Sequence, residues 1–451
     1  MPERSALGGL VALVLGSFAV VMSATTINVA IAPMMVEYSI SHSLAQGFSS
    51  VFLGMTVVCA PLTSWLADRF GAWRVFVRLL LLYALASLLA GVSDSFGSML
   101  VVRGVQGICA GIIQPLSMFL VLETAHPDRQ GRTLSLFSLG VVLAPGLGPT
   151  LAGFVVELTD WRYTFWLGLP PALLSLWLVY LFKPQDAVKS RAAAAPDLVG
   201  LALLAVLVGL VFLWPFLLVV SLLLALLVAA LWGLLCVLFW QQLKRRDAPL
   251  VSPDLLSHRA YFYGLLVTLA YGVGMYGSIF LVPLMLQKGM GVSALTTGNL
   301  LLLGGVALVI SIPLSGRLVD RFSPQLVVLI GLVCFALSCF LLAWPGGLII
   351  VGVGVVLSRV ALGMIIPGLY TGMARAVSAD SLRAGTALTT MTRQAGGAFG
   401  ITMIGVLLGV LDRVLVVPGL SYRILFLVLG LLFLLSLFAA VGMGRFSSGA
   451  Q

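Results

Sequence analysis

Long apolar runs, separated by short polar loops, are the feature of this sequence that most restricts its fold. The charged residues make up only 9% of the 451 residues, against roughly a quarter in soluble globular proteins. The apolar fraction is 61% and the mean hydropathy is +1.16. A soluble fold of this length cannot hide so much apolar surface, so the sequence predicts a chain whose solvent is lipid.

The apolar runs are long enough for about fourteen membrane-spanning helices, since a span needs about 20 mostly apolar residues. The stretch 198–240 would be about 65 Å long as one helix at 1.5 Å per residue, about twice the bilayer core. We therefore expect it to fold back at Trp214-Pro215. The expected spans lie near residues 7–33, 44–67, 73–92, 96–124, 131–156, 161–182, 197–214, 217–243, 260–287, 293–320, 325–344, 347–377, 382–411 and 422–444.

The placement of Lys and Arg supports this count independently, because these residues gather on cytoplasmic loops. With the N-terminus inside, 18 of the 25 basic residues fall on the cytoplasmic side and 4 on the outer side; the other 3, Arg103, Arg359 and Arg393, fall within spans. We therefore expect a multi-pass protein of the bacterial cytoplasmic (inner) membrane with both termini cytoplasmic. The net charge of +10 does not indicate a nucleic-acid partner, because the basic residues form no continuous stripe.

Two ten-residue stretches of the chain are identical at six of their ten positions. Residues 61–70 read PLTSWLADRF and residues 313–322 read PLSGRLVDRF, and both copies end an expected span on the cytoplasmic side. Two similar halves related by an axis along the membrane normal are typical of transporters. We predict an N-terminal six-helix bundle over 1–182, a linker with two inserted helices over 183–259, and a C-terminal six-helix bundle over 260–451.

Several segments resemble motifs of the major facilitator superfamily. Residues 64–74 resemble its loop signature, residues 103–107 its span-4 motif, and residues 148–153 the span-5 motif of its antiporters. The inserted pair of spans resembles the fourteen-span drug:proton antiporter branch, as do residues 160–165, 245–250 and 393–397. The resemblance implies an all-α integral membrane protein of the major facilitator fold with 14 transmembrane helices. It also implies alternating access and proton-driven efflux.

Charged residues after spans 2 and 10 are the expected gate. Asp68 and Asp320 can each pair with an arginine or cap the helix that follows, and such pairs can be made and broken as the halves move. Gly71 permits a tight turn. The alternative is that these residues only fix the loops. The gate set is Asp68, Arg69, Gly71, Arg74, Asp320 and Arg321.

Polar residues within the spans are the expected cavity residues, since a charge at the centre of a span costs about 2.5–3.5 kcal/mol on insertion scales. Arg103, Gln106 and Gln114 lie roughly on one helix face. Tyr271 and Tyr276 are five residues apart, so we expect only one of them to line a cavity. The alternative for Arg103 is that backbone carbonyls neutralise it and that it merely joins helices, and the alternative for the tyrosines is helix packing. The cavity set is Asn28, Arg103, Gln106, Gln114, Tyr271, Tyr276, Arg393 and Gln394.

Glycines and prolines of span 5 form the antiporter-type helix motif. Gly148 and Pro149 are expected to distort the span and to let a neighbouring helix approach closely. Ordinary packing of small residues is the alternative. The motif set is Pro145, Gly146, Gly148, Pro149 and Gly153.

Span 1 departs from the family pattern, because Ser23 stands where the fourteen-span branch usually has an aspartate. No Asp or Glu lies at the centre of any expected span. Proton coupling therefore falls to peripheral acids, with Glu123 and Glu157 as the candidates. A cavity with arginines and few acids favours neutral, zwitterionic or anionic cargo.

The sequence thus predicts a secondary transporter that exports small organic compounds or drugs by proton antiport. The proton motive force is the expected energy source, with no cofactor and no metal. The expected partners are the substrate and the lipid bilayer; a periplasmic adaptor is left open, and a monomer is the expected functional unit. Two alternatives are an exporter or facilitator of a neutral or anionic metabolite without proton coupling, and a non-transporting sensor or assembly subunit. An enzyme is not expected, because no set of catalytic groups lies at one depth.

Overall fold

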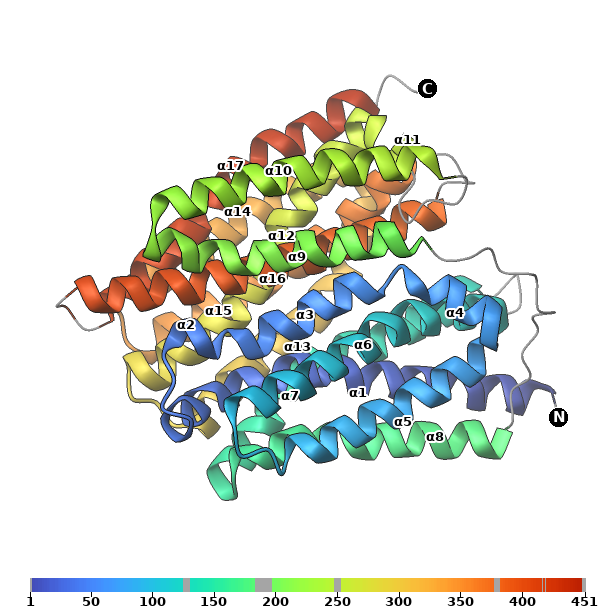
Figure 1. Ribbon diagram of the computed structural model, residues 1–451, viewed down its shortest axis with the longest axis horizontal. Helices are drawn as coiled ribbons and strands as arrows, with labels where there is room; N and C mark the ends of the chain where they lie inside the picture. The colour runs from blue at the N-terminus through green and yellow to red at the C-terminus, as the bar shows by residue number, and fades with distance from the viewer. Residues whose placement is uncertain are drawn as a thin grey trace. The chain divides into compact units, whose positions relative to one another are not determined.

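The computed structural model describes residues 2–124, 130–182, 197–246, 253–376, 382–415, 417 and 419–447 (Figure 1). All regular elements in these ranges are helices. They are α1 (Pro2–Glu37), α2 (His42–Ala45), α3 (Gly47–Cys59), α4 (Leu62–Phe70), α5 (Ala72–Ala90), α6 (Phe96–Thr124), α7 (Gln130–Leu158), η2 (Trp161–Gly168), α8 (Leu169–Phe182), α9 (Leu198–Val220), α10 (Leu222–Arg245), α11 (Pro253–Ser257), α12 (Arg259–Leu284), η3 (Met285–Gly289), α13 (Ala294–Arg321), α14 (Pro324–Ala343), α15 (Leu348–Arg375), α16 (Leu382–Val414) and α17 (Leu420–Ser447).

The helices form two compact units. Unit 1 comprises Met1–Ser39 and Val51–Pro196, and unit 2 comprises Ile40–Ser50 and Asp197–Gln451. In unit 1, α1 packs against α6, α7, η2 and α8; in unit 2, α12 packs against α15, α16 and α17. The inserted helices α9 and α10 fall in unit 2. The division into six, two and six helices stays a prediction.

Most of the helices are long and apolar enough to cross a membrane. Within the described ranges, twelve helices satisfy both conditions, so the chain is a multi-pass membrane protein. The two remaining expected spans, 44–67 and 131–156, coincide with α3 and α7, whose apolar stretches Gly47–Cys59 and Leu147–Leu158 are shorter. The all-α membrane architecture is confirmed, and the total of fourteen spans stays a prediction.

The turn between the two inserted spans lies at Ser221, so the prediction of a turn at Trp214-Pro215 is wrong. Helix α9 continues through Pro215, and Ser221 has an extended backbone with φ −161° and ψ 121°. A helix from Leu198 to Trp214 would contain about 17 residues, at the short limit for a span. The observed helices contain 23 and 24 residues, so each is long enough to cross.

Polar side chains hold the inserted hairpin together at both ends. The indole N–H of Trp214 donates to the carbonyl oxygen of Ala225 at 3.0 Å, near the turn. At the open end, Asp197 caps the N-terminus of α9 and accepts a hydrogen bond from the amide of Gln242 at 2.8 Å. The hairpin is therefore one packed element, as Figure 1 shows for α9 and α10.

The second expected span is interrupted. Helix α3 ends at Cys59 and α4 begins at Leu62, because Pro61 between them has no backbone N–H to continue the helix. Helix α4 ends at Phe70, and the φ of 87° at its C-cap residue Gly71 lies in the left-handed region that favours glycine. The tight turn predicted at Gly71 is confirmed.

Candidate transport site

A buried arginine joins α1 to α6 in the middle of unit 1. Arg103 is fully buried, and its Nη1 donates to the carbonyl and hydroxyl oxygens of Ser23, both at 3.2 Å. The same nitrogen donates to Oε1 of Gln106 at 2.9 Å. The guanidinium also lies over the ring of Phe52, 4.4 Å from its centroid. Ser23, which replaces the acid of the family pattern, is thus in direct contact with Arg103.

The other cavity residues predicted in unit 1 have different surroundings. The amide of Gln106 donates to the hydroxyl of Ser87 at 3.0 Å, so Arg103 and Gln106 belong to one network that also reaches α5. Gln114 lies further along α6 and is half-buried. Asn28 is buried and donates to carbonyl oxygens of its own helix at 3.2 and 3.3 Å. Of these residues, the structure thus brings Arg103 and Gln106 together in one network.

Glycines set the distance between α3 and α6 beside this network. A Cβ atom at Gly107 would collide with the carbonyl oxygen of Phe52, and one at Gly111 would lie 2.6 Å from the carbonyl oxygen of Thr56. The hydroxyl of Thr56 donates to the carbonyl oxygen of Gly107 at 3.2 Å. The glycine four residues after Arg103 therefore lets α3 approach closely enough for Phe52 to cover the guanidinium.

The span-5 motif lies against α1. A Cβ atom at Gly148 would lie 2.8 Å from the hydroxyl oxygen of Thr25, so the structure shows the close approach expected there. Helix α7 continues through Pro149, and Gly153 is buried. The side chain of Pro145 and the surroundings of Gly146 lie outside the described part of the chain. The role of this motif in antiport stays a prediction.

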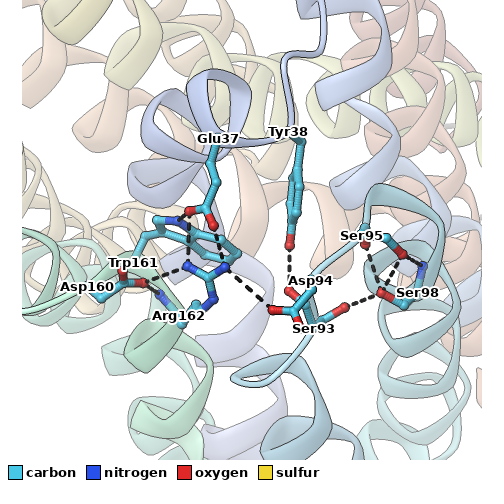
Figure 2. Close-up of polar contacts among 9 residues, drawn as sticks. All are labelled: Glu37, Tyr38, Ser93, Asp94, Ser95, Ser98, Asp160, Trp161 and Arg162. Carbon is cyan, nitrogen blue, oxygen red and sulfur yellow. Dashed lines mark hydrogen bonds and ion pairs between the residues drawn. The ribbon is translucent and has the colours of Figure 1, made fainter.

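An ion-pair cluster at one end of unit 1 was not predicted from the sequence (Figure 2). The carboxylate of Glu37, at the end of α1, accepts hydrogen bonds from both terminal nitrogens of Arg162 and from the indole N–H of Trp161, the last at 2.6 Å. Asp160 accepts from the backbone N–H of Arg162 at 2.8 Å, and a carboxylate oxygen of Asp94 lies 3.8 Å from the guanidinium. The family resemblance singles out residues 160–165, but no local spacing relates them to Glu37, 125 residues away.

Two further arginines lie within the helices of unit 2. Arg359 on α15 is 6% exposed, and its side-chain stem lies against Gly304 of α13, where a Cβ atom would be 2.9 Å from Cγ. Arg393 on α16 is half-buried, and its Nε is inaccessible. Among the described residues, neither guanidinium has a hydrogen-bond or ion-pair partner.

Tyrosines of α12 and α15 surround Arg393. The phenol groups of Tyr271, Tyr276 and Tyr370 lie within electrostatic range of its guanidinium, and Tyr271 is also within range of Arg359. Tyr271 is buried and Tyr276 is half-buried. The two tyrosines expected to diverge thus both approach Arg393, because the long arginine side chain lies within reach of both. Which of them lines a cavity stays a prediction.

The two glycines that follow Arg393 and Gln394 bring α16 against α12. A Cβ atom at Gly396 would collide with the backbone of α12, and one at Gly397 with the ring of Tyr276. A Cβ atom at Gly272 on α12 would collide with the carbonyl oxygen of Arg393. Such small-residue contacts let membrane helices approach closely. The segment 393–397 therefore positions Arg393 beside the tyrosines of α12.

The predicted gate residues lie at helix ends. Asp68 and Arg69 are exposed at the end of α4, and Arg321 is exposed at the end of α13. The capping alternative for Asp68 is wrong, because the N-cap residue of α5 is Gly71 and no side chain caps that helix. Arg74 is exposed in the first turn of α5. The side chain of Asp320 lies outside the described residues, and gating stays a prediction.

The predicted coupling acids are at the periphery. Glu157 is exposed near the end of α7, and the side chain of Glu123 lies outside the described residues. Neither location tests a role in proton coupling.

A histidine–carboxylate contact in unit 2 is a second feature that the sequence analysis missed. Nε2 of His42 lies 3.4 Å from a carboxylate oxygen of Asp412. Burial lowers the pKa of His42 below its ordinary value of 6.5; Asp412 opposes this shift and Lys288 adds to it. His42 and Asp412 lie 370 positions apart along the chain, so no sequence spacing could indicate their contact.

The comparison with protein families decides the class of this chain. The model of the Major Facilitator Superfamily matches residues 13–401 and 264–446. The chain belongs to the major facilitator superfamily. It is therefore a membrane transporter rather than an enzyme.

Several members of the superfamily are similar to this chain over most of its length. The uncharacterized MFS-type transporter YhcA of Bacillus subtilis is 29% identical over 413 residues, 88% of this chain and 75% of that protein. The multidrug export protein EmrB of Escherichia coli K12 is 30% identical over 344 residues, 73% of this chain and 65% of that protein. A multidrug resistance protein B homolog of Mycobacterium tuberculosis H37Rv is 26% identical over 417 residues, 88% of this chain and 75% of that protein.

Solved structures of superfamily transporters share the fold. The human organic anion transporter MFSD10 superposes with a TM-score of 0.65 at 18% identity, covering 97% of this chain and 99% of that one. A POT family transporter in complex with a thioalcohol-conjugated peptide superposes with a TM-score of 0.73 at 14% identity, covering 99% of this chain and 96% of that one. At these identities the likeness concerns the fold alone, and it confirms the major facilitator fold.

Proposed function

We propose that this transporter exports small organic compounds from a bacterial cell by proton antiport with alternating access. Three arginines within the helices carry the proposal: buried Arg103 in unit 1, and buried Arg359 and half-buried Arg393 in unit 2. Charged groups within membrane spans are costly, and a functional role is their default interpretation. The direction of transport rests on the similarity to relatives named as multidrug export proteins.

The proposed topology has both termini in the cytoplasm of the bacterial inner membrane, following the distribution of Lys and Arg. In this orientation the two Asp-Arg loops, at Asp68-Arg69 and Asp320-Arg321, are both cytoplasmic. Pairs made by these loops would close the cytoplasmic side and open again as the halves move. The exposure of Asp68 and Arg69 leaves them accessible for such contacts.

Proton coupling is assigned to peripheral acids, with Glu123 and Glu157 as the candidates. Ser23 occupies the position of the usual acid and contacts Arg103 with neutral oxygens, so this position contributes no titratable group. The expected experiment is proton flux in proteoliposomes, followed with a lumenal pH dye after addition of a transported compound. Substrate-dependent proton flux that vanishes in Glu123→Gln or Glu157→Gln supports the assignment, with Asp94→Asn as an exposed control.

Ser23 also supports a second candidate function, which is transport without proton coupling. An exporter or facilitator without proton coupling would need no acid in span 1, and Ser23 fits that function equally well. This alternative predicts solute flux that is indifferent to the pH gradient. A chain that binds solutes but moves none of them would instead fit the sensor or assembly subunit.

A further inference from the structure

Five polar side chains of unit 2 have in common that none makes a hydrogen bond within the described part of the chain. They come from three helices: α12, α15 and α16. Buried polar groups normally have partners, because leaving one unpaired costs free energy. The set is Tyr271, Tyr276, Arg359, Arg393 and Gln394.

Four of these five side chains are linked by proximity. Arg393 lies within electrostatic range of Tyr271 and Tyr276, and Tyr271 lies within range of Arg359. Gln394 is next to Arg393 in sequence and 3% exposed, and its carbonyl oxygen Oε1 has no partner in the described part of the chain. The two arginines and the two tyrosines of this set thus lie close to one another in unit 2.

The chemistry of these groups is dominated by donors and by positive charge. A guanidinium offers five N–H donors and no acceptor, and a phenol can donate as well. Among the described residues, no carboxylate lies within ion-pair distance of Arg359 or Arg393. An anion that accepts several hydrogen bonds would satisfy both the charge and the donors. The rings of Tyr271 and Tyr276 add flat apolar surface suited to an aromatic group.

Burial alone does not leave an arginine without hydrogen bonds, as Arg103 of unit 1 shows. Arg103 is also buried, but it donates to Ser23 and Gln106 and is covered by Phe52. Arg359 and Arg393, in contrast, make no hydrogen bond in the described part of the chain, although phenol oxygens lie near Arg393. Arg103 thus differs from Arg359 and Arg393 in having hydrogen-bond acceptors for its Nη1 within its own unit.

We propose that Arg393, with Arg359 and the phenols of Tyr271 and Tyr276, forms a binding site for an organic anion that carries an aromatic ring. This inference deepens the proposed export function by naming its substrate class. Arg393 is half-buried and supplies the accessible charge, while Arg359 lies deeper and adds positive potential. Oε1 of Gln394 would accept a hydrogen bond from a ligand that also carries a donor.

Binding to the purified full-length protein in nanodiscs tests the proposal without requiring transport. Three naphthalene probes of similar size are compared by isothermal titration calorimetry: 1-naphthalenesulfonate, neutral 1-naphthalenesulfonamide and cationic (1-naphthylmethyl)trimethylammonium. The sulfonate is expected to bind at least about tenfold more tightly than either of the others, as expected for loss of one charge-assisted interaction of about 1.4 kcal/mol or more. Equal or tighter binding of the cation would overturn the proposal.

Substitutions locate the site. Arg393→Gln is expected to weaken sulfonate binding at least about tenfold while changing sulfonamide binding little, and Arg393→Lys should retain part of the affinity. Arg413→Gln is the matched control, because Arg413 is an exposed arginine on the same helix. Sulfonate binding that is unchanged in folded Arg393→Gln would also overturn the proposal. If that variant does not fold, the comparison of the three probes on the wild-type protein still decides.

Nanodisc composition separates a soluble anion from a lipid headgroup. Sulfonate affinity should be the same in phosphatidylcholine nanodiscs with and without phosphatidylglycerol. Strong competition by phosphatidylglycerol would assign the site to a lipid phosphate and contradict the substrate class. A protein that binds the sulfonate but transports nothing would refute the proposed function and leave the anion site standing.

Discussion

At the scale of residues, a single replacement in α1 defines the centre of unit 1. Ser23 offers Arg103 a hydroxyl and a carbonyl oxygen where the family pattern has an acid. The guanidinium is therefore held by neutral acceptors and by the ring of Phe52. This arrangement makes Arg103 a fixed cation that joins α1 to α6. Removing its side chain would leave acceptors on both helices without their donor.

We expect Arg103→Met to destabilise the protein by about 1–3 kcal/mol, because Gln106 and Ser23 lose the donor that satisfies them. Thermal melting in detergent measures the effect, and Arg78→Gln, an exposed arginine on α5, is the control. A melting temperature equal to that of the control would show that the network contributes nothing to stability.

A pH effect on stability is expected at His42. Since burial lowers its pKa below 6.5, the unfolded chain binds more protons than the native state once the pH falls below about 6.5. The contribution to the free energy of unfolding is thus full above the unfolded value and is lost as the pH falls through it toward the lowered native pKa. His42→Gln should therefore melt with a weaker pH dependence than wild type between about pH 7.5 and pH 5.5.

Asp412 raises the pKa of His42 and Lys288 lowers it. Because salt screens both effects, the variant and the wild type must be compared at one ionic strength. His258→Gln, at an exposed histidine before α12, should leave the wild-type pH dependence intact. Identical pH profiles for wild type and His42→Gln would refute the account of this histidine.

At the scale of elements, glycines determine which helices approach closely enough to build the sites. Gly107 allows α3 to reach α6, and Gly272 and Gly396 allow α12 to reach α16. In the second pair the close approach places Tyr271 and Tyr276 beside Arg393. The glycines that set the distance between two helices thus also decide which polar side chains meet between them.

Gly272→Ala is expected to cost about 1–3 kcal/mol, the range for overpacking, because its Cβ atom would collide with the carbonyl oxygen of Arg393. Gly209→Ala in α9 is the control, since a Cβ atom there meets nothing within 4 Å. Thermal melting of both variants checks the prediction, and equal stability of the two would mean that α12 and α16 adjust without cost.

The cluster of Figure 2 fastens three segments of unit 1, namely the end of α1, the loop between α5 and α6, and the start of η2. Glu37→Gln is expected to destabilise by about 1 kcal/mol, because the pair with Arg162 is bidentate but partly exposed. A double-mutant cycle with Arg162→Gln measures the coupling. Asp94→Asn should have a smaller effect, since its side chain is 90% exposed and 3.8 Å away; a larger effect there would contradict this ranking.

At the scale of the whole molecule, the sequence predicts the all-α membrane fold well and the sites only partly. Apolar length and charge asymmetry depend on local composition, so the positions of the helices follow from the sequence. The turn at Ser221 does not follow from Pro215, because a proline is tolerated inside a membrane helix and α9 continues through it. The pairs Glu37–Arg162 and His42–Asp412 were missed because they join residues that only the tertiary fold brings together.

We propose that this molecule moves a small organic solute against its gradient with protons as the driving force. Proteoliposomes with an acidic lumen, loaded with the wild-type protein and given 1-naphthalenesulfonate outside, test it most directly. We expect the sulfonate to accumulate above the level of protein-free vesicles, and we expect this accumulation to stop when nigericin in potassium buffer collapses the pH gradient. Accumulation that ignores nigericin would contradict proton coupling, and no transport of this or any other solute tested would contradict export itself.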